Sequence, residues 1–120
     1  MSKKILINCN HGREDAERAT LPFVVANVSA SADQDTIVFL TIEGVRLATK
    51  GYADGLQKEG FPPLGEVIRS FLSNGGQVWA CGACTKPRGI GDADLIEGAR
   101  IVTAANVVEE VVGGATVLSV

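Results

Sequence analysis

The sequence predicts a single three-layer α/β domain, with a mainly parallel sheet of about five strands and helices on both of its faces. Strand-like runs alternate with helical runs along the chain, an order typical of a parallel sheet with crossover helices. The strand-like runs are apolar at nearly every position, as expected for strands that are buried on both faces. The length of 120 residues fits one domain, which we assign to residues 1–120.

The first half of the chain predicts two strands and two helices. Residues 3–9 form an apolar run that favours a buried strand. A helix is expected to begin near Asp15, because apolar residues then follow at helical spacing, and Pro22 should bend it or shorten its first turn. A second buried strand over residues 36–42 and a short helix over residues 45–50 complete this half.

The second half predicts three further strands. The clearest helix covers residues 63–74, with Pro63 at its first position and a glycine pair after its end. The third strand, residues 77–81, leads into a turn or helix that begins at Gly82. The remaining elements are a helical turn over residues 92–98, a strand over 99–103, a helix over 104–112 and a strand over 115–120.

Composition excludes several classes of partner. The net charge is −3 and no run of basic residues exists beyond Lys3-Lys4, so we expect no nucleic-acid binding. No apolar run approaches the length of about 20 residues that spans a bilayer, and no signal peptide precedes the first strand. We therefore expect a cytoplasmic protein without membrane contact. The mean hydropathy of +0.20 is high for a small monomer and favours a homo-oligomer.

Polar and sulfur-bearing residues follow three of the predicted strands. Cys9 and His11 end the first strand, Glu43 follows the second, and Cys81 ends the third. Reactive groups in an open parallel sheet gather beyond the carboxyl ends of the strands. The sequence therefore predicts a site at this edge, with Cys9, His11 and Glu43 as supporting residues.

Cys81 is the candidate nucleophile. It precedes a predicted helix start, where free backbone N–H groups stabilise a thiolate. Gly82 allows a sharp turn that leaves the sulfur accessible, and Arg88 supplies positive charge nearby. A second thiol, Cys84, lies three residues further on and favours a chemical role for Cys81 over a merely structural one. No phosphate-binding loop follows the first strand, so no nucleotide or other cofactor is expected.

The run Val78-Trp79-Ala80-Cys81-Gly82-Ala83-Cys84-Thr85-Lys86-Pro87-Arg88-Gly89-Ile90 resembles the DsrE/DsrF-like family, which includes the TusD-type sulfur-relay proteins. The resemblance extends in order to His11-Gly12, Glu17-Arg18-Ala19, Gly44-Val45 and residues 94–99. It implies a YchN-like fold, trimers or hexamers, and sulfur relay as a cysteine persulfide with other relay proteins as partners. The family's reactive cysteine lies shortly before an Arg-Gly pair, which matches the spacing from Cys81 to Arg88-Gly89. The resemblance thus implies that Cys81 is the sulfur carrier, and Cys84 and Cys9 are additions to the TusD-like pattern.

Three alternatives remain open at this point. No bound metal is expected, but Cys9, His11, Cys81 and Cys84 would make a tetrahedral zinc set if the first and third strands were neighbours. Cys81 and Cys84 have the spacing of a dithiol–disulfide couple. The chain could also be an oligomeric interaction protein without catalysis, in which case replacing all three cysteines would leave its function intact.

Overall fold

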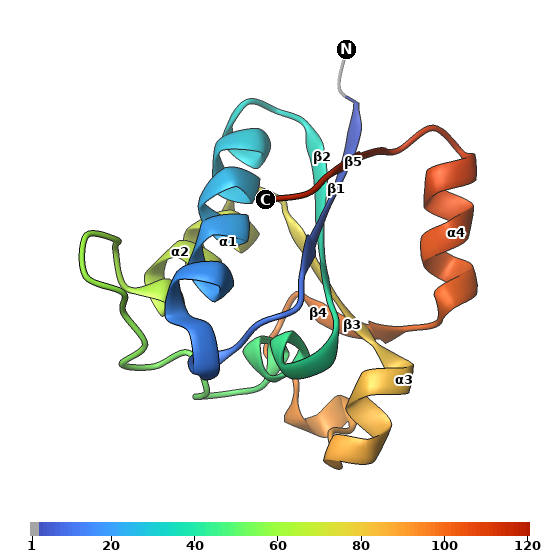
Figure 1. Cartoon of the computed structure of the whole chain (residues 1–120). Helices are drawn as coiled ribbons and strands as arrows, with labels where there is room; N and C mark the ends of the chain where they lie inside the picture. The colour runs from blue at the N-terminus through green and yellow to red at the C-terminus, as the bar shows by residue number, and fades with distance from the viewer. Residues whose placement is uncertain (1–2) are drawn as a thin grey trace.

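The computed structural model describes residues 3–120 and has a five-stranded, entirely parallel sheet (Figure 1). The strand order is β4-β3-β2-β1-β5. The strands are β1 (Lys4–Cys9), β2 (Asp35–Leu40), β3 (Gln77–Cys81), β4 (Ala99–Val102) and β5 (Thr116–Leu118). The predicted α/β class is confirmed.

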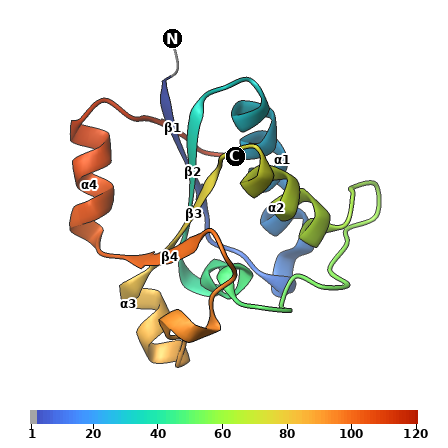
Figure 2. The ribbon, with the colours of Figure 1, turned by 180° about the vertical axis from the view of Figure 1, so that it is seen from behind.

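Helices cover both faces of the sheet, as predicted. α1 (Ala16–Ser31) and α2 (Leu64–Ser73) pack side by side on one face, and α4 (Ala104–Val112) lies on the other (Figure 2). Right-handed crossovers account for this division. From β1 to β4, each new strand is added beside the previous one, and α1 and α2 lie on one face of the sheet. α4 then crosses the opposite face, so that β5 pairs with β1.

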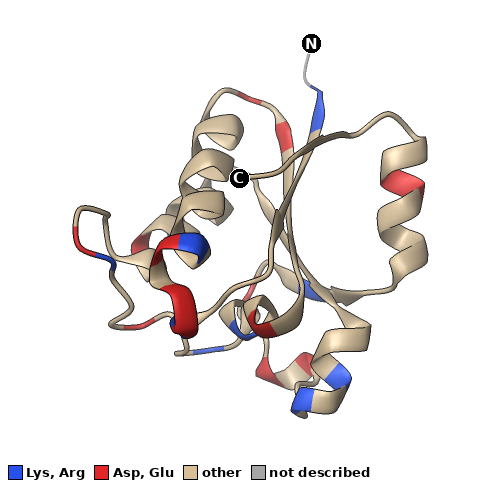
Figure 3. Cartoon of the chain, viewed as in Figure 1, with Lys and Arg blue, Asp and Glu red and all other residues tan. Residues whose placement is uncertain are grey.

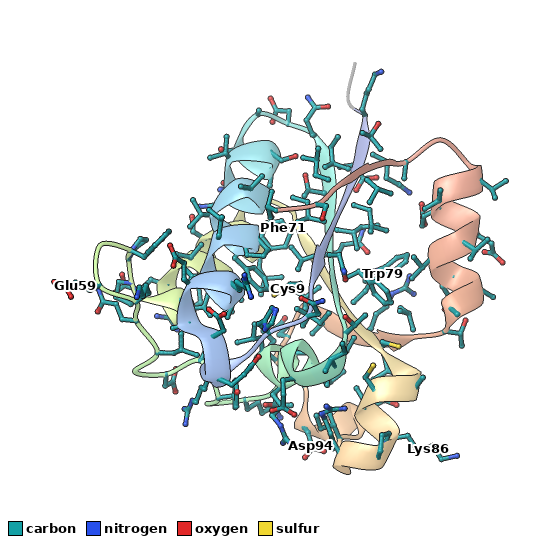
Figure 4. All side chains as sticks on the ribbon, in the orientation of Figure 1. Cys9, Glu59, Phe71, Trp79, Lys86 and Asp94 are labelled. Atoms are coloured by element: carbon teal, nitrogen blue, oxygen red, sulfur yellow. The ribbon has the colours of Figure 1, made fainter. Side chains whose placement is uncertain are left out.

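The two faces are packed very unequally. The main core lies between the sheet and α1 and α2, where Phe23 and Phe71 meet edge to face with ring centroids 6.0 Å apart. The α4 face has a small cluster of Ile37, Trp79 and Val102, and α4 itself has no buried residue. Figure 4 shows Phe71 and Trp79 on these two opposite sides of the sheet.

Several element boundaries differ from the sequence prediction, among them those of β5 (predicted 115–120), of the 3-10 helix Ile42–Ala48 (predicted helix 45–50) and of the turn Asp92–Asp94 (predicted 92–98). β2 ends at Leu40, because Ile42 adopts a left-handed backbone conformation with φ 55° and begins a 3-10 helix over Ile42–Ala48. Pro63 precedes α2 and does not occupy its first turn, since its ψ of 131° is not helical.

The sequence predicts that Pro22 bends the first helix or shortens its first turn. In the structure α1 is not shortened, because it continues through Pro22 to Ser31. Within residues 3–120, no helix combines the length and the apolar character that crossing a membrane requires.

The carboxyl ends of β1, β2 and β3 meet at one edge of the sheet, at the bottom of Figure 1. Gly44 lies in the 3-10 helix after β2 and packs directly against the backbone at the end of β1. A Cβ atom at Gly44 would overlap the carbonyl oxygen of Cys9 and would lie 3.3 Å from the Cα of Asn10. Only glycine allows this close approach.

We therefore predict that Gly44→Ala lowers the free energy of unfolding by about 1–3 kcal/mol, because backbone atoms on both sides must move apart. The matched control is Gly65→Ala in α2, where the nearest atom to a new Cβ is the flexible Arg69 Nη1 at 3.4 Å. That change should raise stability by about 0.5–1 kcal/mol, as alanine favours a helix over glycine. Urea unfolding measures both, and an unaffected Gly44→Ala protein would contradict the close contact.

Candidate functional site

Cys81 and Cys84 lie on one turn at the carboxyl end of β3. Cys81 is the last residue of β3 and the N-cap of the short helix α3 (Gly82–Thr85), which contains Cys84. Both thiols are free and half-buried. The predicted placement of these two residues, at the end of the third strand and at a helix start, is confirmed.

The backbone of this turn is fixed by tight packing against β4. A Cβ atom at Gly82 would lie 3.2 Å from the Val102 carbonyl oxygen and 3.4 Å from Ile101 Cγ2. The buried Thr85 hydroxyl donates to the Gly82 carbonyl at 3.2 Å and closes the helical turn. Gly82 thus serves the close approach of two strand ends as well as the sharp turn that the sequence predicts.

An ion-pair network ties the same turn to the segment after β2. Arg88 Nε donates to Glu43 Oε1 at 2.8 Å, and Arg88 Nη1 donates to the Cys84 carbonyl at 3.1 Å. The second carboxylate oxygen of Glu43 accepts from Arg46 Nε at 3.0 Å. Hydrogen bonds from Arg88 and Arg46 lower the pKa of the Glu43 carboxyl below its ordinary value, so the network is ionised at neutral pH.

Arg88 therefore acts on the backbone of the turn. Within residues 3–120 its guanidinium makes no hydrogen bond to a cysteine sulfur. It binds both the Cys84 carbonyl and Glu43, which lies 45 residues before Arg88 in the sequence. Stabilisation of a sulfur anion by Arg88 stays a prediction.

Cys9 is the third thiol and is buried beneath α1 (Figure 4), with 1% of its surface exposed. Its Sγ lies 3.7 Å from the His11 carbonyl oxygen and 3.8 Å from the Ala19 carbonyl oxygen of α1. Burial raises the pKa of the Cys9 thiol to about 11, so the group is protonated at neutral pH. This thiol is poorly suited to nucleophilic chemistry.

His11 is engaged by a neighbouring carboxylate. Its Nδ1 lies 2.8 Å from Glu14 Oε2, and the other oxygen of Glu14 accepts from the Gly12 N–H at 2.6 Å. These contacts organise the loop after β1. They give His11 a local structural partner at the opposite end of this edge from Cys81.

The strand order contradicts the hypothesis that Cys9, His11, Cys81 and Cys84 together bind zinc. The hypothesis required β1 and β3 to be neighbours, but β2 lies between them. Strands are spaced by about 4.8 Å, so Cys9 and His11 are about 10 Å of sheet width away from Cys81 and Cys84. No group of three or more Cys, His, Asp or Glu side chains in the described part of the chain is placed to hold a metal ion.

Sequence reasoning missed the partners that fix the site. It named Glu43 and Arg88 as separate site residues but did not predict the contact between them. Two residues that are 45 positions apart show no local sequence pattern that would indicate a contact. The spacing of Glu43 and Arg46, three residues apart within one helical segment, was a usable signal for their ion pair.

Comparison with known proteins identifies the family. The sequence profile of the DsrE/DsrF-like family matches residues 3–119. The chain belongs to this family. Membership supports a sulfur-related role in general, and it agrees with the resemblance found in the sequence.

Curated relatives of this DsrE/DsrF-like protein come from methanogens. Protein MJ0760 of Methanocaldococcus jannaschii is 34% identical over 93 residues, and these cover 78% of this chain and 34% of that protein. The chain thus spans about a third of the length of this relative. Protein MK0008 of Methanopyrus kandleri is 30% identical over 92 residues, which cover 77% of this chain and 73% of that protein.

Two solved structures share the fold. The YchN protein from E. coli superposes with a TM-score of 0.79 at 22% identity, and both chains are covered completely. Protein MTH1491 from Methanobacterium thermoautotrophicum gives a TM-score of 0.77 at 17% identity, covering 99% of this chain and 100% of that one. The predicted YchN-like fold is confirmed.

The raised pKa of Cys9 predicts a loss of stability at high pH. The thiol has a pKa of about 11 in the folded chain against an ordinary value of 9.0, so the folded state holds its proton more tightly. Above pH 9 the unfolded chain ionises first, and the free energy of unfolding falls as the pH rises from about 9 to about 11. The full effect is about 3 kcal/mol.

Urea unfolding at pH 8 and pH 10.5 measures this loss, with Cys9→Ala as the comparison. The variant is less stable at pH 8 because a cavity remains, but it should lose less stability between the two pH values. An equal loss in both proteins would show that Cys9 does not titrate in this way.

Proposed function

We propose that this protein carries sulfur as a persulfide on Cys81. The observation that carries the proposal is the half-buried Cys81 thiol at the carboxyl end of a central parallel strand, in a chain of the DsrE/DsrF-like family. Ligands and reactive groups of open α/β sheets gather at this edge. A sulfur carrier also needs a thiol that partners can reach.

The environments of the three thiols favour Cys81 over Cys9. Cys9 is sealed beneath α1 and keeps its proton, whereas Cys81 and Cys84 are partly exposed on a rigid turn. Cys81 also precedes the first turn of α3, whose N–H groups have no acceptors within the helix. Such groups stabilise negative charge on a nearby sulfur.

The transfer step is a thiol exchange that needs no net oxidation. The Cys81 thiolate attacks the outer sulfur of a donor persulfide, R–S–SH. A new S–S bond forms at Cys81, the S–S bond of the donor breaks, and the donor leaves as the thiolate R–S⁻. The reverse reaction with an acceptor thiolate delivers the sulfur. Donor and acceptor would be other sulfur-relay proteins, in a reducing compartment such as the cytoplasm.

Cys84 offers a route for release. Its thiolate can attack the inner sulfur of a Cys81 persulfide, which frees hydrosulfide and leaves a Cys81–Cys84 disulfide. A cellular thiol must then reduce this disulfide before another cycle. The spacing of three residues on one helical turn supports this role. The same pair is the basis of the alternative dithiol–disulfide function.

We propose in addition that the protein self-associates through its C-terminal apolar surface. This surface comprises four valines of α4 and β5 on the α4 side of the sheet, each at least 44% exposed: Val108, Val111, Val112 and Val117. α4 has no buried residue, and its ribbon carries little charge in Figure 3. A second copy that packs here would bury the apolar area that the sheet leaves uncovered.

Incubation with a persulfide donor such as glutathione persulfide, followed by intact-mass spectrometry, tests the sulfur carrier. The wild-type chain should gain one sulfur atom, and Cys81→Ser should lose this gain. Cys84→Ser is the matched control on the same turn, and it should keep the added sulfur longer. Full sulfur addition to Cys81→Ser would contradict the proposal, and rapid disulfide formation in the wild type alone would favour the dithiol alternative.

Sedimentation analysis tests self-association with two matched variants. Val112 is 82% exposed in α4, so Val112→Lys should leave the fold intact and shift the protein towards the monomer. Val28 of α1 is 65% exposed on the other side of the sheet, and Val28→Lys should leave the assembly unchanged. A monomeric wild type, or an equal effect of both lysines, would argue against this surface.

A further inference from the structure

A cavity lies apart from the cysteine turn, between α2, the segment of residues 49–54 and the loop before β4. Its volume is about 340 Å³, near the lower end of the range for small-molecule sites. None of its lining residues belongs to the segment from Cys81 to Arg88. An inference about this cavity therefore stands independently of the sulfur-carrier proposal.

The walls of the cavity are held by hydrogen bonds between distant segments. Residues 48–50 run antiparallel to residues 94–96, where the Ile96 N–H donates to the Ala48 carbonyl at 2.8 Å. The Lys50 N–H donates to the Asp94 carbonyl at 3.0 Å. These contacts fix one end of the 49–54 segment, so the cavity is preformed.

Tyr52 anchors the middle of the same segment. Its carbonyl accepts from Arg13 Nε at 3.0 Å, and its hydroxyl accepts from the Arg13 backbone N–H at 2.8 Å. The Arg13 guanidinium also lies 4.8 Å from the centroid of the Tyr52 ring. The segment is thus attached both to the loop after β1 and to the loop before β4.

The floor of the cavity is aliphatic. It is formed by Leu47, Ile68, Leu72 and Ile96, and no aromatic residue is among the lining side chains in the described part of the chain. Nucleobases and sugars usually stack on aromatic side chains. An aliphatic group of modest size fits this floor better.

Four charged residues surround the cavity: Lys50 and Arg69, and Asp54 and Glu97. A Cβ atom at Gly65 would lie 3.4 Å from Arg69 Nη1 and 3.8 Å from Asp54 Oδ1, so one cation and one anion lie near this glycine. The Lys50 ammonium donates to the Ala93 carbonyl at 3.1 Å. Among residues 3–120, none of the four takes part in an ion pair. Both signs of charge are therefore available to a ligand.

We propose that this cavity binds a free aliphatic α-amino acid. Its carboxylate is recognised by Arg69 and Lys50, its ammonium group by Asp54 and Glu97, and its side chain by the aliphatic floor. A zwitterion satisfies both pairs of charges without leaving a net charge in the site. A volume of about 340 Å³ has room for one such amino acid.

An NMR titration of the full chain with L-leucine tests the proposal. Saturable shifts are expected at the amides of Ile68, Leu72 and Ile96. The matched probes are 4-methylpentanoate and 3-methylbutylamine, which keep the aliphatic group and carry a single charge each. Both should bind at least about tenfold more weakly, because each leaves one pair of charged residues without a partner.

Two variants and their controls complete the experiment. Gly65→Leu should block the cavity and abolish the shifts, while Glu66→Leu, at an exposed neighbouring position of α2 outside the lining, should bind leucine as the wild type does. Arg69→Gln should weaken binding about tenfold. Cys81→Ser should bind normally, which separates this site from the sulfur-carrier proposal.

Three results would overturn the amino-acid site. One is the absence of saturable shifts with L-leucine up to ~20 mM, a concentration at which even weak ligands are detected. Another is equal affinity for the singly charged probes. The third is unchanged leucine binding by Gly65→Leu.

Discussion

The parallel pairing of β2 with β3 is the constraint on which the site depends. It brings the segments that follow these strands to the same edge, where Glu43 reaches Arg88 at 2.8 Å. Arg88 in turn holds the Cys84 carbonyl, and β4 packs against Gly82 from the other side. The turn with Cys81 and Cys84 is therefore held from two directions by elements that are far apart in the sequence.

The sheet and its direction were predictable from local pattern. Runs such as residues 36–42 are apolar at consecutive positions. This pattern distinguishes strands that are buried on both faces from strands that have one solvent-exposed face. The boundary at Leu40 was not predictable, because the left-handed turn at Ile42 is imposed by the tight packing of Gly44 against β1. β-branched residues rarely adopt this conformation, so the sequence gives no hint of it.

The candidate site was predictable only in part. Strand-end placement correctly located Cys81 and Cys84, since it depends on local sequence alone. The zinc hypothesis failed because strand order is a tertiary property, and β2 separates Cys9 from Cys81. The three thiols that look alike in the sequence thus have different environments. Burial makes Cys9 a packing residue with a raised pKa, and exposure leaves the other two available.

The unequal covering of the sheet is the structural basis of the proposed self-association. α1 and α2 bury the main core, whereas α4 packs only Val107 against the smaller cluster around Trp79 and leaves Val108, Val111 and Val112 exposed. Arg100 lies over the Trp79 ring at 4.6 Å and shields part of this face with a charged side chain. An apolar helix over a thin layer is typical of a surface that a further copy completes.

The most direct test of the central claim is the sulfur state of the protein as it exists in cells. Protein purified from its natural source in the presence of an alkylating agent, and then digested, reports each cysteine as a thiol, persulfide or disulfide by peptide mass spectrometry. The account predicts an alkylated persulfide on Cys81 and an unmodified thiol on Cys9. A persulfide confined to Cys84 or Cys9, or none on Cys81 in cells with an active sulfur supply, would contradict it.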